Sequence, residues 1–104
     1  MSTYNAKGDK MNSYQIEITD TFAGEANYSW VKRETFTMPD LYHYGYDGSS
    51  NYVKTNKVYR RELVKKAKAI AGWTGARCKV EDYGDMIRIE PKGACMVAFV
   101  DYKD

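Results

Sequence analysis

Residues 57–71 read KVYRRELVKKAKAIA, a stretch in which apolar side chains recur with the period of an α-helix. At about 100° per residue, the apolar side chains share one side of that helix: Tyr59, Leu63, Ala67 and Ile70. The opposite side carries Lys57, Arg61, Lys65 and Lys68. The stretch is therefore predicted to be an amphipathic helix that is capped by Asn56, with Thr55 and Ser50 as alternative caps, and that stops at Gly72.

The segments on both sides of this helix have the patterns of β-strands. Upstream, residues 13–22 and 28–37 alternate or are rich in β-branched and aromatic residues, with turn formers between them, which indicates a hairpin. Downstream, residues 76–83, 86–90 and 94–102 are three short extended runs separated by turns at 84–85 and 91–93. We expect these residues to line the face under the helix: Cys78, Val80, Ile87, Ile89, Cys95, Val97 and Phe99.

The resulting order, ββαβββ, predicts an α+β fold, an antiparallel sheet of about five strands with one amphipathic helix packed on one face. A chain of 104 residues fits one domain, which we assign to residues 13–104, with the polar residues 1–12 as a flexible N-terminal arm. Trp30 and Trp73 are expected in the core or at its edge. The final DYKD matches the start of a common epitope tag, although Tyr102 also continues the last strand; both readings stay open.

The composition of the chain is typical of a globular protein and gives no sign of a membrane-spanning or exported one. Hydrophobic residues make up 43% of the chain and charged residues 29%, which are ordinary globular values. The longest apolar run, residues 95–100, is too short to span a bilayer, and residues 1–12 contain no apolar stretch of the signal-peptide type. We therefore expect a cytoplasmic protein without a membrane partner.

Residues with catalytic or metal-binding chemistry are few. The chain has one histidine, His43, and two cysteines, and it contains no nucleophile elbow, phosphate loop or metal-ligand spacing. The acidic residues 81, 82, 85 and 90 surround a predicted turn, where carboxylates are common for structural reasons. The sequence thus predicts no enzyme activity, no cofactor and no metal.

A tyrosine-rich loop leads into the cationic helix. Residues 1–50 carry four Lys or Arg against seven Asp or Glu, whereas residues 51–104 carry twelve against seven, so positive charge is concentrated around the helix. Tyrosines among Gly, Ser and Asn are typical of adaptable binding loops. The candidate partner-binding residues are Tyr42, Tyr44, Tyr46, Tyr52, Lys57, Arg60, Arg61, Lys65 and Lys68.

The favoured hypothesis is a small non-enzymatic module that binds a protein with an acidic surface, in the manner of a phage or mobile-element inhibitor of a host nucleic-acid-handling or defence complex. The alternative is a small DNA- or RNA-binding regulator in which the cations meet phosphates and the tyrosines stack on bases. Asp40 and Asp47 in the loop would repel phosphate, which favours the first hypothesis. A helix face that is merely solvated, the identity of the partner and the oligomeric state all stay open.

Overall fold

The predicted fold class is confirmed: the protein has an α+β fold in the order ββαβββ. The computed structural model describes residues 3–4, 10–23, 25–46 and 52–103. Its long elements are the strands β2 (Lys10–Phe22) and β3 (Glu25–Pro39), the helix α1 (Tyr52–Ala71), and the strands β4 (Cys78–Asp82), β5 (Met86–Pro91) and β6 (Met96–Tyr102). A two-residue strand β1 (Thr3–Tyr4) and a short 3-10 helix η1 (Leu41–Tyr44) complete it.

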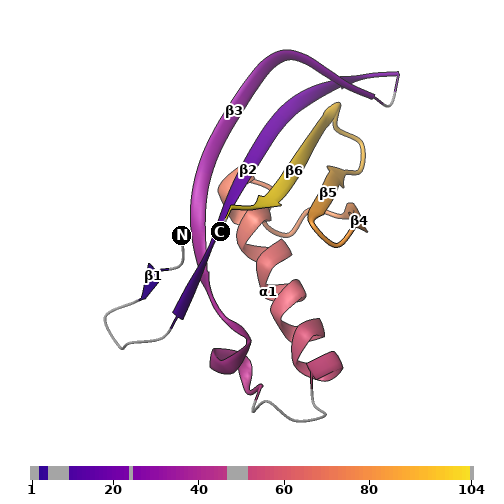
Figure 1. Ribbon diagram of the computed structural model, residues 1–104. Coiled ribbons are helices and arrows are strands. Elements are labelled where there is room, and N and C mark those ends of the chain that lie inside the picture. The colour runs from indigo at the N-terminus through magenta and orange to yellow at the C-terminus, as the bar shows by residue number, and fades with distance from the viewer. Residues whose placement is uncertain (1–2, 5–9, 24, 47–51, 104) are drawn as a thin grey trace.

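The sheet is antiparallel, and its long strands follow the order β3-β2-β6-β5-β4. The short β1 pairs with the start of β2, on the edge that β6 occupies further along. The sequence predicted a flexible arm over residues 1–12, but two parts of it belong to paired strands: Thr3–Tyr4 and Lys10–Asn12. Backbone groups make these pairings, so the polar side chains of residues 1–12 do not prevent them. The β2–β3 hairpin is longer than the other strands and projects past them (Figure 1).

Helix α1 covers one face of the sheet, and the core lies between these two layers (Figure 1). The strands β2, β3, β5 and β6 all contribute alternate side chains to that core. The most deeply buried residues of this cluster between helix and sheet are Ile16, Met38, Leu63, Ala67, Ile87, Ile89, Ala98 and Val100. The alternation predicted for β2 and β5 is therefore the alternation observed.

The face predicted for β6 is wrong. Ala98 and Val100, not Val97 and Phe99, pack toward α1, because Ile18 and Ile16 of β2 lie opposite them in the sheet. Residues 95–100 are a continuous apolar run, so the sequence holds no alternation from which to choose a face. The pairing with β2 makes that choice instead, since a shift of one residue exchanges the two faces of a strand.

The helix is longer than predicted at its start and ends where predicted. It begins at Tyr52 and not after Asn56, and its buried row starts with Thr55, a polar residue that apolar periodicity does not count. At the other end Gly72 has φ 81°, a left-handed conformation that favours glycine. The Gly72 amide donates to the Ala69 carbonyl and the Trp73 amide to the Lys68 carbonyl, which is the Schellman pattern.

The two tryptophans have different environments. Trp73, directly after the helix stop, is 7% exposed and belongs to the core, as predicted. Trp30 is 45% exposed, so its assignment to the core or core edge is wrong. It lies on β3 among residues 27–30, which face Asp20 where the pairing between β2 and β3 shifts register.

Candidate partner-binding surface

Four cations lie in one exposed row on the outer face of α1, and we call this row the cationic stripe: Lys54, Lys57, Arg61 and Lys65. Their spacing of three, four and four residues keeps them on one side of the helix over about 16 Å. No ion pair joins any of them to another described residue. Lys54 escaped the sequence prediction because the helix was expected to begin after it.

Two further cations of the predicted site, Arg60 and Lys68, are held inside the fold. Arg60 lies 3.6 Å from the Asp82 carboxylate through Nε and donates from Nη2 to the Gly84 carbonyl at 3.1 Å. Lys68 donates from Nζ to the Ala76 carbonyl at 2.7 Å. Both side chains therefore tie α1 to the segment that follows it, and they border the stripe without sharing its full exposure.

The predicted tyrosines divide between the core and the surface. Tyr44 is half-buried and meets Tyr59 edge-on at 5.8 Å, and its burial, helped by the negative charge of Glu62, raises its pKa. Tyr46 meets Tyr52 edge-on, also at 5.8 Å, and Tyr52 is 49% exposed. The side chain of Tyr42 and residues 47–51 lie outside the described part of the chain.

The tyrosine cluster continues into the core through a pair of hydroxyl groups. Tyr59 and Tyr14 share a hydrogen bond of 2.6 Å between their hydroxyls. The side-chain amide of Asn12 donates from Nδ2 to the Tyr59 hydroxyl at 3.1 Å. Tyr14 stacks on Phe36, and its pKa is raised, first by burial and then by the hydrogen bond with Tyr59. Rings packed in this way support the domain and offer few free faces to a ligand.

A groove of about 340 Å³ runs beside the stripe, between α1 and the turn that follows it. We call it the α1 groove; it is lined by Arg61, Val64, Lys65, Lys68, Thr74 and Gly75. No sequence signal marks it, because it forms only when the turn at residues 74–75 folds back along the helix. Cations thus border an otherwise largely apolar hollow.

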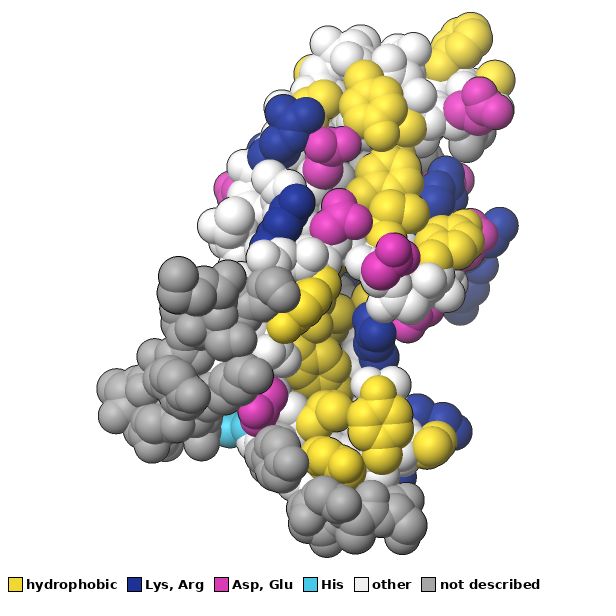
Figure 2. Space-filling model, viewed as in Figure 1, with side chains coloured by type: hydrophobic (Ala, Val, Ile, Leu, Met, Phe, Trp, Pro, Cys, Tyr) yellow, Lys and Arg dark blue, Asp and Glu magenta, His cyan; other side chains and the backbone are white. Residues whose placement is uncertain are grey.

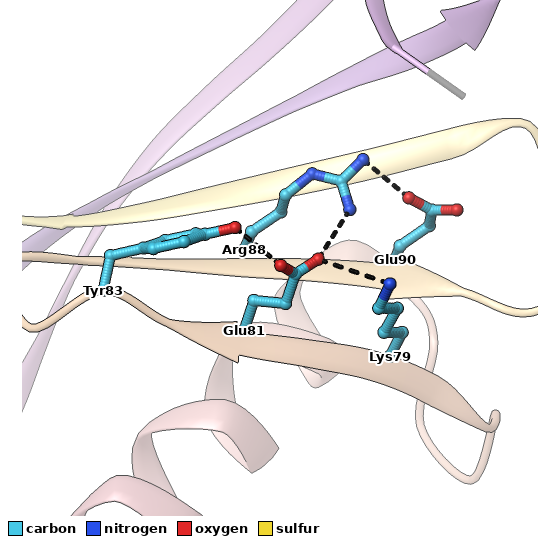
Figure 3. Close-up of polar contacts among 5 residues, drawn as sticks. All are labelled: Lys79, Glu81, Tyr83, Arg88 and Glu90. Atoms are coloured by element: carbon cyan, nitrogen blue, oxygen red, sulfur yellow. Dashed lines mark hydrogen bonds and ion pairs between the residues drawn. The ribbon is translucent and has the colours of Figure 1, made fainter. Parts of the chain in front are cut away.

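Glu81 of β4 and Glu90 of β5 belong to an ion-pair network on the sheet face away from α1 (Figure 3). Arg88 reaches Glu90 at 2.6 Å and Glu81 at 3.4 Å, and Lys79 lies 3.7 Å from Glu81. The Tyr83 hydroxyl donates to Glu81 at 2.7 Å and, together with the two cations, lowers the pKa of that carboxyl. These carboxylates are engaged with cations, as is typical of a polar sheet surface.

The histidine and the cysteines lie apart in different elements. His43 in η1 meets Tyr44 edge-on at 5.1 Å. Cys78 is half-buried and packs against the core, whereas Cys95 is exposed in the turn before β6, so its predicted place on the inner face is wrong. Both thiols are free.

Within residues 3–4, 10–23, 25–46 and 52–103, no three His, Cys, Asp or Glu side chains are grouped as metal ligands would be. No helix in that same part of the chain has both the length and the apolar composition to cross a membrane. No protein-family model, curated protein or solved structure matches the chain. The cationic stripe and the α1 groove are therefore its best-defined candidate site.

Proposed function

We propose that the protein is a small non-enzymatic binding module that docks on an acidic surface of another protein through the cationic stripe. The observation that carries this proposal is the gathering, in one exposed row, of four cations that have no acidic partner among the described residues. Lys32, Arg33, Arg60, Lys79 and Arg88 each have an acidic partner within the chain. The stripe concentrates four charges that no described carboxylate neutralises, and such a row steers and orients an acidic partner.

Apolar side chains beside the stripe favour a protein partner. Val53 is 67% exposed and Tyr52 49% exposed at the first turn of α1, and Val64 lines the α1 groove. Protein interfaces combine apolar and aromatic anchors of this kind with a polar rim. Occupation of the partner's surface would block other ligands there, so inhibition of a host nucleic-acid-handling or defence complex is the role we propose for the module.

Charge reversal on the stripe tests this function. The variant Arg61→Glu/Lys65→Glu reverses the charges in the C-terminal half of the stripe, and Lys92→Glu/Lys103→Glu makes the same change in net charge at exposed positions elsewhere. In a capture experiment from host extract with nuclease present, we expect the wild type and the control variant to retain the same bound proteins. The stripe variant should no longer bind them. Equal capture by both variants would contradict the proposal.

The alternative, binding of nucleic acid, is favoured by the regular spacing of the stripe alone. Four phosphate contacts predict that log affinity for a duplex oligonucleotide falls with log salt at a slope of about −3.6, and that the stripe variant reduces this slope by about half. Fluorescence anisotropy with a labelled duplex and a labelled single strand measures both. Binding with this salt dependence, together with loss of captured proteins on nuclease treatment, would replace the protein-binding function by this one.

A further inference from the structure

The far end of the β2–β3 hairpin presents large aromatic side chains to solvent. β6 pairs with β2 only as far as Asp20, so the hairpin beyond that point projects past its neighbours (Figure 1). Phe22 is 75% exposed, Tyr28 52% and Trp30 45%. Figure 2 shows hydrophobic side chains at the surface of this upper end of the molecule. We call the described residues 20–23 and 25–30 the hairpin end.

Hydrogen bonds hold the backbone of the hairpin end in a defined conformation. The β2–β3 register shifts between Thr19 and Thr21, which leaves residues 27–30 as a bulge opposite Asp20. Tyr28 has φ 57°, a left-handed conformation that bulky residues rarely adopt. Its amide donates to Thr19 Oγ1 at 3.0 Å, and the Ser29 amide donates to Asp20 Oδ1 at 3.0 Å. A strained conformation that is braced in this way points to a function for the side chains it presents.

The charge of the hairpin end is negative. Residues 18–31 contain Asp20 and Glu25 but no Lys or Arg. Hydrogen bonds from Asn27 and Ser29 lower the pKa of Asp20 to about 2, so this carboxylate stays ionised at neutral pH. The surface that fits such an end is an apolar hollow bordered by positive charge.

The α1 groove of the same protein has these properties. Arg61, Lys65 and Lys68 border it, and Val64 contributes an apolar wall. Its volume of about 340 Å³ is enough for an aromatic side chain. Every residue that lines it comes from α1 or from the turn at 74–75, so the hairpin of its own chain does not fill it.

We propose that the hairpin end of one copy docks into the α1 groove of a second copy, so that the protein associates head to tail. This inference deepens the proposed function, on which it rests, by naming a second copy as an acidic partner of the stripe. The two contacting surfaces differ, so the contact is heterologous and adds copies in a row unless the row closes into a ring. The small contact area implies weak association that depends on concentration and salt.

Complementary variants test the proposal by sedimentation velocity over a range of concentrations. The hairpin variant Phe22→Ser/Trp30→Ser and the groove variant Arg61→Glu/Lys65→Glu each keep one intact surface. We expect the wild type and Lys92→Glu/Lys103→Glu to gain mass with concentration, and each surface variant to stay monomeric alone. An equimolar mixture of the two should form dimers and nothing larger, because each copy then contributes one working surface. Circular dichroism confirms that each variant is folded.

A wild type that stays monomeric at millimolar concentration and low salt would overturn the head-to-tail contact. So would association of either surface variant with itself as strongly as the wild type, or a mixture of the two that stays monomeric. These outcomes leave the proposed function intact if nuclease-resistant capture of other proteins still depends on Arg61 and Lys65. Loss of that dependence while the mixture still forms dimers would instead overturn the proposed function alone.

Discussion

At the scale of single residues, Tyr59 connects the half-buried Tyr44 to Tyr14 in the core. Its hydroxyl accepts a hydrogen bond from the Asn12 side-chain amide and shares another with the Tyr14 hydroxyl. Its ring makes an edge-on contact with Tyr44. Tyr59 is 5% exposed and Tyr14 7%, so water cannot easily replace a lost partner. A buried polar group without a partner costs more than its hydrogen bond contributes.

Removal of the Tyr59 hydroxyl should therefore destabilise the protein more than removal of the Tyr14 hydroxyl. Tyr59→Phe removes the hydrogen-bond partner of the Tyr14 hydroxyl and of the Asn12 side-chain amide. We expect the unfolding free energy to fall by about 1–3 kcal/mol. Tyr14→Phe leaves Tyr59 still bonded to Asn12 and should cost less, and the double change should cost less than the sum. Urea unfolding of the three variants measures this, and equal, additive losses would contradict it.

At the scale of elements, α1 has a buried row and an exposed cationic row on opposite sides. Thr55, Tyr59, Leu63 and Ala67 repeat every four residues and are buried, while the cationic stripe repeats on the exposed side. The helix packs on the sheet through its buried row, with further contacts from Arg60, Lys66 and Lys68, and the charges of the cationic stripe take no part in this attachment. The stripe belongs to the surface of the protein and contributes little to holding the fold.

The two rows should respond differently to substitution. Leu63 is fully buried, so Leu63→Ala should lower the unfolding free energy by about 2–5 kcal/mol. Lys57→Glu, on the exposed row near the positive end of the helix dipole, should leave stability unchanged or slightly raised. Urea unfolding followed by circular dichroism compares them. A large loss with Lys57→Glu would show that the outer row holds the fold.

At the scale of the whole molecule, one core joins the helix to the sheet, and the hairpin end extends beyond it. Trp73 reports on the core and Trp30 on the hairpin end, since the first is buried and the second exposed. Strands from both halves of the chain and α1 share the same buried cluster. A domain built in this way is expected to unfold in a single cooperative transition.

Single-tryptophan variants test this expectation and the single domain assigned to residues 13–104. With Trp30→Phe, the emission of Trp73 should be blue-shifted and resist acrylamide quenching, and it should change in the same urea transition as the helical circular dichroism. With Trp73→Phe, the emission of Trp30 should be red-shifted and readily quenched. Two separate transitions in the Trp30→Phe variant would contradict a single cooperative domain.

The amino-acid sequence by itself determined the order of elements, because strand alternation, helix periodicity and the stop at Gly72 depend on residues close together in the chain. It also placed Lys57, Arg61 and Lys65 on one exposed side of the helix, but it missed Lys54 and counted Lys68, which is held inside the fold. Only the tertiary structure decided the face of β6, the exposure of Trp30, the internal roles of Arg60 and Tyr44, and the α1 groove. These features depend on register and on side chains that meet from distant segments, and no local pattern encodes which partners meet.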